Sequence, residues 1–364
     1  MSDLGDRIAA RIRREGPLSV AAFMAMALHD PQSGYYARRD PLGRAGDFIT
    51  APEISQVFGE LIGLCLAEWW HRAGRPEPVV LAELGPGRGT LMQDFRRAAD
   101  TVPGFRAAIS LHLVEASRPL REVQQRRLAG LGPRFHDSID TLPDGPLLLV
   151  ANEFLDALPI RQFVRGLAHW AERLVALDID DRLVFAEGRE SPAATLLIPP
   201  ALRQAPPGTV FELCPAAAAL AGWLGERLGQ DPGAALFIDY GYSPSAPGPT
   251  LAAVRQHAAV RVLENPGEVD LSAHVDFAAF ASAAQAAGAT VHGPVPQGCF
   301  LAALGAETRL AMLSAGADPV RSAALASGVA RLLDPSGMGN LFKVLGLTSA
   351  GLPVPAGFAQ QTEP

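Results

Sequence analysis

Residues 79–92 read Val-Val-Leu-Ala-Glu-Leu-Gly-Pro-Gly-Arg-Gly-Thr-Leu-Met, and this stretch decides the expected fold. A run of apolar and β-branched residues ends at the acid Glu83, three alternating glycines follow, and a segment of helix-compatible residues then begins. Gly85, Gly87 and Gly89 have no Cβ atom and adopt positive φ easily, so the backbone can turn sharply and approach a ligand closely. The stretch therefore predicts a buried strand, a tight turn that binds a ligand, and the start of a helix.

The spacing of the glycines favours one class of ligand. A dinucleotide-binding turn reads G-x-G-x-x-G and brings a helix N-terminus to a pyrophosphate, but Thr90 stands where the third glycine would be needed. The pattern Glu83-x-Gly85-x-Gly87-x-Gly89 instead resembles the first motif of class I S-adenosylmethionine (SAM) methyltransferases. Their ligand carries a cationic ammonium, which an acid attracts. A tight turn without a ligand is the alternative, and the rest of the chain has to decide between the two.

Composition and charge describe an ordinary globular protein. The chain has 364 residues, of which 48% are hydrophobic and 19% charged, enough for one large core with insertions or for two domains. A formal net charge of −7 argues against non-specific binding to nucleic acid, which needs a basic face. The three cysteines, Cys65, Cys214 and Cys299, are too widely spaced for a disulfide framework or a C-x-x-C metal site. Since we find no apolar run of the roughly 18 residues that a membrane helix needs, we expect a cytoplasmic protein.

Residues 1–77 are expected to form a helical region that contains one functional loop. Asp3 and Ser19 are suitable N-caps for two helices, because apolar residues recur behind them at helical spacing. Residues 40–55 form a long loop rich in glycine, and such loops are more often functional than short connectors are. The loop carries three candidate site residues, Asp47, Thr50 and Glu53. The alternative is that these side chains only stabilise turns and the start of the next helix.

From residue 78 the chain alternates between predicted strands and helices, which indicates an α/β fold with a mostly parallel sheet. The strand at residues 109–114 ends at Glu115, where a carboxylate can accept hydrogen bonds from both ribose hydroxyls of a nucleoside. Capping of the helix at residues 117–131 is the alternative role of Glu115. A third short strand would place Asp137 and Ser138 near an adenine.

The strand at residues 146–151 is followed by Asn152-Glu153-Phe154-Leu155-Asp156-Ala157-Leu158-Pro159. Ligands of open parallel sheets bind beyond the carboxyl ends of the strands, so these polar groups are expected where a methyl acceptor would lie. Glu153 and Asp156 are three residues apart, and on a short helical turn they would share a face and could hold a guanidinium or an amine. A capped helix start is the alternative interpretation.

Residues 160–232 interrupt the alternation with antiparallel strands and a proline-rich loop, and we interpret them as an inserted α+β segment that covers the acceptor site. The core, which we place at residues 78–159 and 233–347, resumes with a strand that ends at Asp239. His274 and Asp276 follow as further candidates, although a lone histidine is more often structural. A strand pair is expected around Thr290 and Phe300, and residues 348–364 are expected to be a disordered tail.

Four segments and a C-terminal pattern together resemble the MidA family of SAM-dependent methyltransferases. The resemblance runs in matching order from about residue 16 to residue 347, and its segments are residues 46–55, 83–91, 152–159 and 270–277, with Met338-Gly339 and residues 342–345 near the end. It implies a Rossmann-like class I methyltransferase fold with seven strands. It also implies kinship with the mitochondrial complex I assembly methyltransferase, which modifies an arginine of a peripheral-arm subunit of NADH dehydrogenase.

The resemblance and the residue patterns together give a set of expected roles. The expected cofactor is SAM, with S-adenosyl-L-homocysteine (SAH) as product, and no metal ion is expected. The expected partner is a protein substrate, most simply a complex I subunit. A homodimer is also compatible with the sequence. The expected residues are, for catalysis, Glu153, Asp156, Asp47 and Glu53; for the cofactor, Glu83, Gly85, Gly87, Gly89, Thr90, Glu115, Asp137, Ser138 and Asn152; and for the substrate, Thr50, Asp239, His274 and Asp276.

Two rival functions remain open from the sequence. An NAD-dependent oxidoreductase would share the sheet and an acid such as Glu115. An assembly factor that binds SAM without transferring its methyl group would share every cofactor residue, because a binding site alone does not prove catalysis.

Overall fold

The structure, a computed structural model, describes residues 3–38 and 49–358. The chain divides into two compact units. The first unit consists of Met1–Phe48, Asp156–Ala219 and Tyr242–Asp276, and the second of Ile49–Leu155, Leu220–Gly241 and Phe277–Pro364. Asp47, a predicted catalytic residue, lies outside the described residues.

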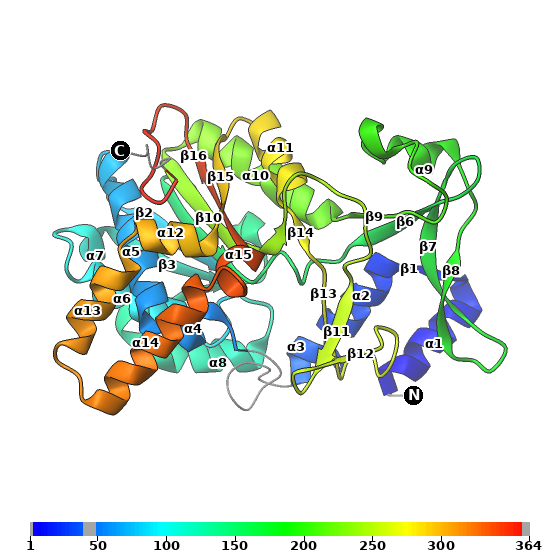
Figure 1. Ribbon diagram of the computed structural model, residues 1–364, viewed down its shortest axis with the longest axis horizontal. Helices are drawn as coiled ribbons and strands as arrows, with labels where there is room; N and C mark the ends of the chain where they lie inside the picture. The colour runs from blue at the N-terminus through cyan, green and yellow to red at the C-terminus, as the bar shows by residue number, and fades with distance from the viewer. Residues whose placement is uncertain (1–2, 39–48, 359–364) are drawn as a thin grey trace. The chain divides into compact units, whose positions relative to one another are not determined.

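The second unit contains a large, mostly parallel sheet (Figure 1). Seven of its strands lie in the order β15-β16-β10-β5-β2-β3-β4, and among these only β16 runs antiparallel to its neighbours. This arrangement confirms the seven-stranded class I fold expected from the sequence. The bounds are β2 (Val79–Leu84), β3 (Ile109–Val114), β4 (Arg134–His136), β5 (Leu147–Asn152), β10 (Gly233–Tyr242), β15 (Thr290–Pro296) and β16 (Phe342–Thr348).

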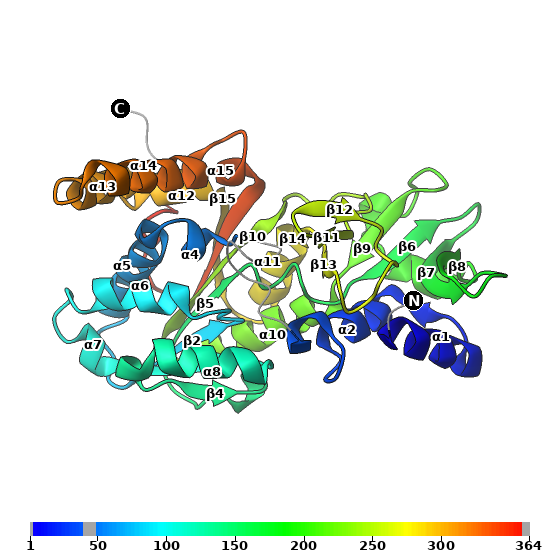
Figure 2. The same ribbon diagram turned by 90° about the horizontal axis from the view of Figure 1, so that it is seen from below.

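Helices cover both faces of this sheet, which is why its central strands are almost wholly apolar. Figures 1 and 2 show α5 (Gln56–Arg72) and α6 (Thr90–Ala99) on one face and α10 (Pro215–Gln230) and α11 (Phe277–Ala286) on the other. A Cβ atom on Gly59 of α5 would lie 2.7 Å from the Cβ atom of Asp94, so a glycine lets α5 and α6 pack closely. The remaining helices of this unit are α4 (Ala51–Ile54), α7 (Phe105–Ala108), α8 (Arg118–Arg127), η1 (Ala129–Leu131), η2 (Ile139–Thr141), α12 (Gln297–Ala303), α13 (Ala306–Ser314), α14 (Pro319–Leu333) and α15 (Met338–Leu341).

The first unit is built from two small antiparallel sheets and helices that pack on them. One sheet has the order β1-β7-β6-β9, with β8 paired to β7, and the other has the order β12-β11-β13. The antiparallel strands predicted after residue 160 are therefore confirmed. The strands of these two sheets are β1 (Leu18–Ser19), β6 (Arg161–Arg165), β7 (Trp170–Leu177), β8 (Leu183–Glu187), β9 (Val210–Leu213), β11 (Ala252–Arg255), β12 (Ala258–Val260) and β13 (Asp270–Ser272). The short strand β14 (Val275–Asp276) also falls in the first unit but belongs to neither sheet. The helices are α1 (Asp3–Glu15), α2 (Val20–His29), α3 (Tyr35–Arg38), α9 (Pro192–Leu196) and η3 (Pro200–Leu202).

The division into units differs from the predicted one because the N-terminal helices share a hydrophobic core with the inserted strands. Ile8 of α1 and Phe23 of α2 belong to the same buried cluster as Val175 of β7 and Leu271 of β13. Helices as short as α1 and α2 cannot bury an apolar face alone, so they need such partners. The sequence showed where these helices lie but not what they pack against.

Two further expectations about local structure are wrong. Phe300 lies in helix α12 and not in a strand, and the strand at Thr290 pairs instead with β16. The described part of the predicted disordered tail is ordered: Phe358 is only 8% exposed. Its ring centroid lies 5.2 Å from that of Phe300 and 6.4 Å from that of Trp69. Aromatic side chains from distant parts of the sequence hold it, which a local pattern does not reveal.

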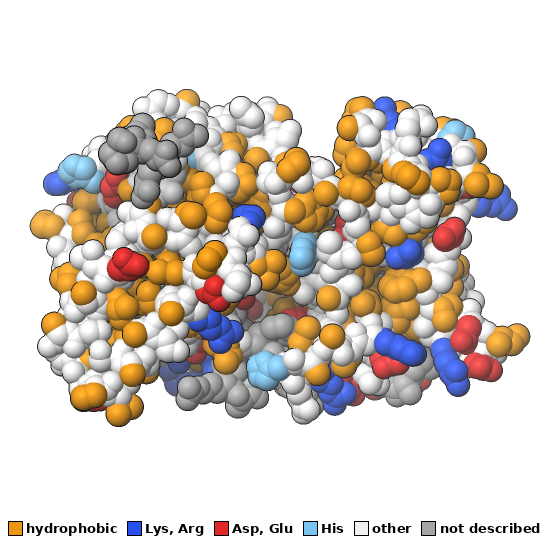
Figure 3. Space-filling view, viewed as in Figure 1, with side chains coloured by type: hydrophobic (Ala, Val, Ile, Leu, Met, Phe, Trp, Pro, Cys, Tyr) orange, Lys and Arg blue, Asp and Glu red, His pale blue; other side chains and the backbone are white. Residues whose placement is uncertain are grey.

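No helix in residues 3–38 and 49–358 is both long and apolar enough to cross a membrane. On the face drawn in Figure 3, the Lys and Arg side chains of the described residues are scattered among hydrophobic and acidic ones.

Replacing Phe358 by alanine should destabilise the protein, because the ring fills space against Trp69 and Phe300 and its loss leaves a cavity. Buried Phe→Ala changes cost about 3–5 kcal/mol. Urea unfolding followed by circular dichroism measures the change. Val354→Ala is the matched control, since Val354 is 53% exposed. Equal stability of the two variants would show that the segment does not pack as described.

Candidate functional site

The turn after β2 has a backbone that only glycine adopts easily. Gly85, Gly87 and Gly89 have φ values of +59°, +52° and +75°. A Cβ atom on Gly85 would lie 2.9 Å from the ring of Phe154, and one on Gly89 would lie 3.0 Å from Leu128. The left-handed backbone favours glycine at all three positions, and close neighbours add to this at Gly85 and Gly89.

Glu83, the acid that precedes the turn, is buried inside the sheet. It is 3% exposed, and its Oε2 atom has no hydrogen-bond partner among the described residues. Burial, together with the nearby charge of Glu115, raises the pKa of Glu83 to about 8. The carboxyl group is therefore mostly neutral at pH 7 unless a cation approaches it.

Glu115 follows β3 and is also buried. Its Oε1 atom accepts a hydrogen bond from the backbone N–H of Ser117 (2.8 Å), and its Oε2 atom accepts one from Nε2 of Gln124 (3.1 Å). Burial raises the pKa of Glu115, and the contacts with Ser117 and Gln124 oppose that rise. The bond to Ser117, the N-cap residue of α8, shows that Glu115 helps to hold the start of this helix.

The predicted adenine-side residues follow β4. The side chain of Asp137 is 89% exposed and pairs with Nη2 of Arg121 at 2.5 Å. Ser138 caps the short helix η2, where its hydroxyl oxygen accepts from the N–H of Asp140.

A series of hydrogen bonds passes through two histidines, His112 of β3 and His136 of the neighbouring strand β4. Nε2 of His112 lies 2.9 Å from Oγ of Ser110, and its Nδ1 lies 2.8 Å from Nε2 of His136. Nδ1 of His136 lies 2.8 Å from Oγ1 of Thr141, which donates to the carbonyl oxygen of Ser138 at 2.8 Å. Burial lowers the pKa of His112 to about 4. These hydrogen bonds connect β3 and β4 to the turn at Ser138.

The short helix α4 is held at both ends by carboxylates. Oε1 of Glu153 accepts a hydrogen bond from the backbone N–H of Ala51 at 2.9 Å. Glu53 accepts one from the hydroxyl of Thr90, the first residue of α6, and Arg127 donates to the same hydroxyl. The structure thus brings the predicted residues Glu53, Thr90 and Glu153 together around α4.

Glu153 does not lie on a helical turn, which corrects the prediction for residues 152–159. The backbone φ of Glu153 is +51°, a left-handed value that residues other than glycine seldom adopt. Residues 152–159 form no helix. Asp239, which is buried in the second half of β10, accepts hydrogen bonds from the N–H groups of Phe154 (3.1 Å) and Leu155 (2.9 Å). These bonds hold the strained residue in place, and strain of this kind gathers at functional sites.

The remaining predicted residues divide between the two units. Asp156, His274 and Asp276 belong to the first unit, so Glu153 and Asp156 fall on opposite sides of the unit boundary. The N–H of His274 donates to Thr250 at 2.9 Å, and Oδ1 of Asp276 accepts from Ser245 at 2.9 Å. Thr50 is the N-cap residue of α4 and makes no side-chain capping bond.

Several buried polar atoms near the turn have no partner among the described residues, and they test whether a cofactor fits. They are Oε2 of Glu83, Oγ of Ser117, Oε1 of Gln124 and Oδ1 of Asn152. All of them can accept hydrogen bonds, so a ligand that presents ammonium and hydroxyl donors would satisfy them. SAM carries both kinds of donor, and the residues therefore fit it. The described residues contain no group of three or more His, Cys, Asp or Glu side chains that could hold a metal ion.

Comparison with known proteins agrees with this chemistry. Residues 61–295 match the model of a family of S-adenosyl-L-methionine-dependent methyltransferases. The chain belongs to this methyltransferase family. The rival prediction of an NAD-dependent oxidoreductase is thereby set aside, and SAM is the cofactor.

The alignments with individual relatives cover more than nine-tenths of this methyltransferase. It is 36% identical to "Protein arginine methyltransferase NDUFAF7 homolog, mitochondrial" from Drosophila melanogaster, over 94% of this chain and 84% of that protein. It is 33% identical to the Homo sapiens protein named arginine methyltransferase NDUFAF7, over 93% and 81%. A solved superfamily member from Burkholderia thailandensis bound to S-adenosyl-homocysteine is 28% identical, with a TM-score of 0.83 over 98% of this chain and 94% of that one.

The expectation of a cytoplasmic methyltransferase is contradicted by these relatives. The curated proteins from Drosophila melanogaster, Danio rerio and Homo sapiens are all designated mitochondrial. The absence of a long apolar run gave no information about the compartment, because a soluble protein can occupy either one.

Sequence reasoning missed four residues that connect the site: Gln124, Arg127, His112 and His136. One signal was available for Gln124. Leu120, Gln124 and Leu128 recur every fourth residue on the buried face of α8, and a glutamine in an apolar row indicates a specific polar partner. Arg127 and Thr90 are 37 residues apart and His112 and His136 are 24 apart, so their pairings have no signal at short range, whereas Ser110 and Thr141 lie only 2 and 5 residues from the histidines they contact.

Replacing Glu83 by glutamine should stabilise the methyltransferase without cofactor at high pH. The pKa of Glu83 is raised from 4.5 in the unfolded chain to about 8, so its contribution to stability is fully present below pH 4.5 and is lost as the pH rises through 8. The Glu83→Gln variant should therefore equal the wild type near pH 4.5 and exceed its free energy of unfolding at pH 9 by on the order of a few kcal/mol.

Urea unfolding between pH 4.5 and 9 measures this difference. The pKa of the buried Asp94 is also raised, to about 6, but Asp94 is present in both proteins and its effect cancels. Glu226→Gln, a change of an exposed residue on α10, is the control. Parallel stability curves for the wild type and Glu83→Gln would contradict the raised pKa.

Proposed function

We propose that this SAM-dependent methyltransferase transfers the methyl group to a guanidinium nitrogen of an arginine in a protein substrate. The proposal is supported by relatives named protein arginine methyltransferase that are 33–36% identical over at least nine-tenths of this chain. We extend it to a peripheral-arm subunit of NADH dehydrogenase, because the family resemblance in the sequence implies such an acceptor during complex I assembly.

The second unit supplies the proposed cofactor residues. Glu83 would pair with the methionine ammonium, since a cation is what lowers the pKa of a buried carboxyl group toward its ordinary value. The glycine turn would let the backbone approach the ligand, and Glu115 would accept from the ribose hydroxyls. Asn152 and the turn at Asp137 and Ser138 would complete the site.

One observation carries the acceptor assignment: the strained position of Glu153 at the carboxyl end of β5. Ligands of open parallel sheets bind beyond the carboxyl ends of the strands, and a left-handed backbone at a non-glycine residue costs about 1–3 kcal/mol. Its Oε1 atom is oriented by Ala51 (2.9 Å) and by Nδ2 of Asn152 (3.1 Å). These two contacts fix the orientation of the Glu153 carboxylate at this end of the sheet.

The proposed mechanism depends on aligning the guanidinium with the methyl group and on positioning its positive charge, more than on a strong general acid or base. SAM supplies an electrophilic methyl group when bound. A guanidinium stays protonated in proteins and offers no lone pair on its nitrogens, so the carboxylate of Glu153 must orient it and draw its charge to the nitrogens that do not react. The nitrogen that accepts the methyl group loses one of its protons during or after transfer. Glu53 and Asp239 would act indirectly, because their described contacts hold α4 and the turn that carries Glu153. Asp156 remains a second candidate for contact with the guanidinium.

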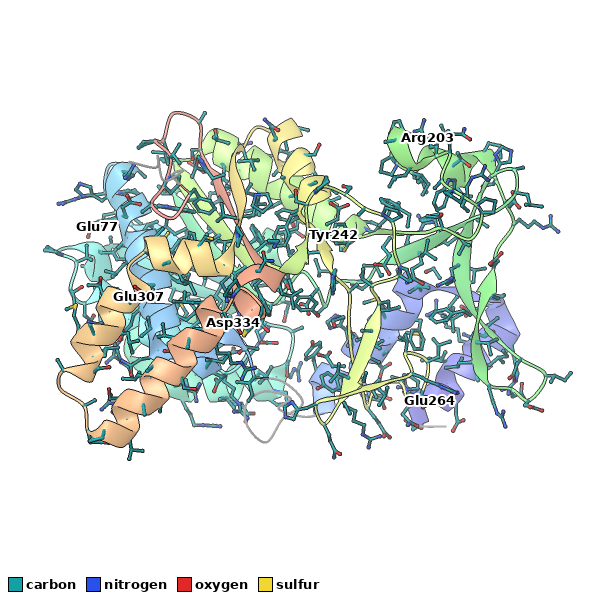
Figure 4. The ribbon with its side chains drawn as sticks, in the orientation of Figure 1. Glu77, Arg203, Tyr242, Glu264, Glu307 and Asp334 are labelled. Carbon is teal, nitrogen blue, oxygen red and sulfur yellow. The ribbon has the colours of Figure 1, made fainter. Side chains whose placement is uncertain are left out.

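Replacing Glu153 by glutamine should leave SAH binding within about twofold of the wild type but lower the rate of methyl transfer at least tenfold, roughly 1.4 kcal/mol. An amide keeps the shape of the side chain and loses the charge that orients the guanidinium. Transfer is measured with labelled SAM and the candidate peripheral-arm subunits, followed by intact mass and site mapping. Glu307→Gln is the control, since Glu307 is exposed on α13 (Figure 4).

Two outcomes would contradict the proposal in different ways. Unchanged transfer by Glu153→Gln would remove Glu153 from catalysis. Tight SAM binding without label on any candidate subunit or extract protein would favour a SAM-binding assembly factor without transfer activity.

A further inference from the structure

Gln124 connects the two parts of the proposed cofactor site. It lies on the buried face of α8 and is 0% exposed. Its Nε2 atom donates to the carbonyl oxygen of Gly87 at 2.6 Å and to Oε2 of Glu115 at 3.1 Å. A single side-chain amide thus joins the glycine turn to the predicted ribose carboxylate.

The orientation of this amide is determined by its partners. Both neighbouring groups are oxygen acceptors, so the nitrogen must face them, and each of its two hydrogens has one acceptor. The reversed amide would place Oε1 against two oxygens and leave both of them without a donor. Gln124 can therefore make these contacts in one orientation only.

The position itself does not need a polar residue for packing. Leu120 and Leu128 stand one turn before and after Gln124 on the same buried face, and a leucine would also fit such an apolar row. Leu128 and Gln124 both lie against the turn, since a Cβ atom on Gly89 would be 3.0 Å from the former and 3.7 Å from the latter. What a leucine would lack is a donor for the two oxygens.

The charges around Glu115 make such a donor important. Burial raises the pKa of Glu115, while the N–H of Ser117, the amide of Gln124 and the charge of Arg121 act in the opposite direction. The charge of Glu115 in turn contributes to the raised pKa of Glu83 in the neighbouring strand β2. A carboxylate that must accept from two hydroxyls has to be ionised, so the loss of one donor would shift it toward the protonated form.

We propose that Gln124 is a positioning residue for the cofactor, which holds the carboxylate of Glu115 and the glycine turn at Gly87 in the arrangement that SAM requires. This inference rests on the proposed role of Glu115 toward the ribose. Gln124 acts through Glu115 and the turn and does not itself touch the reacting atoms.

The test is the pH dependence of SAH binding, measured by titration calorimetry from pH 6 to 8.5 on the full chain. Gln124→Leu should bind SAH about tenfold more weakly than the wild type near pH 6.5 and should recover part of that loss as the pH rises, because Glu115 then ionises. Gln124→Glu should show the opposite trend. Its acid form can donate to Glu115 at low pH, whereas two carboxylates repel each other at high pH and binding weakens.

Several controls separate a positioning role from simple damage to the fold. Gln125→Leu changes the neighbouring exposed residue of α8 and should bind SAH like the wild type. For Gln124→Leu, the KM for SAM should rise about tenfold while kcat at saturating SAM changes less than threefold. If Gln124→Leu does not fold, the nearly isosteric Gln124→Glu still gives the pH trend. Opposite pH trends of the two variants would support the proposal, because a merely structural residue would give two parallel losses.

The failures can be told apart. SAH affinity of both Gln124 variants within twofold of the wild type at every pH would overturn the role of Gln124. Glu115→Gln with wild-type SAH affinity would overturn the ribose assignment, and the proposal for Gln124 would fail with it.

Discussion

Two buried carboxylates on neighbouring strands impose the constraint on which the site depends. Glu83 lies in β2 and Glu115 directly follows β3, the parallel neighbour of β2. Burying a charge without a partner costs several kcal/mol. Glu115 has an N–H donor and an amide donor, whereas Oε2 of Glu83 has no partner among the described residues. The fold therefore retains an electrostatic cost that a ligand with cationic and hydroxyl donors would reduce, and binding of such a ligand would release a proton.

Acidic side chains also hold the backbone of the second unit together. Glu153 accepts from the N–H of Ala51, Asp239 from those of Phe154 and Leu155, and Glu115 from that of Ser117. Each of these N–H groups lies outside the ladders of the sheet, where a carboxylate is a stronger acceptor than a neutral group. Acids that the sequence suggested as chemical groups are thus structural at the same time. A loss of activity on mutation needs a binding or stability control for this reason.

The sequence predicted the parts of the fold that local pattern determines. The strand before the glycines, the strand ending at Glu115 and the helix from Thr90 follow from apolar periodicity and from glycines that lack a Cβ atom. The contacts that it could not predict join distant segments. Glu53 meets Thr90 and Arg127, and Phe358 packs on Trp69, and neither pairing has a signal at short range.

Some local predictions failed because tertiary contacts outweighed propensity. The segment after Asn152 has acids at helical spacing. It is not helical, because the N–H groups of Phe154 and Leu155 donate to Asp239 and the backbone of Glu153 has a left-handed φ. Asp239 itself was predicted as a substrate ligand, because a polar residue at the end of a parallel strand is typical of a binding site. Asp239 accepts hydrogen bonds from backbone N–H groups 84 and 85 residues away and from that of the adjacent Tyr240, and its role toward the substrate stays a prediction.

The hydrogen-bonded histidines of β3 and β4 have a direction. The hydroxyl of Thr141 has a single hydrogen, which it donates to the carbonyl of Ser138, so it must accept from Nδ1–H of His136. Nε2 of the neutral His136 is then an acceptor and requires Nδ1–H on His112, whose own Nε2 accepts from Ser110. The carbonyl oxygen of Ser138 thereby fixes the tautomers of both imidazoles. Every hydrogen bond from Ser110 through His112, His136 and Thr141 is donated in the direction of Ser138.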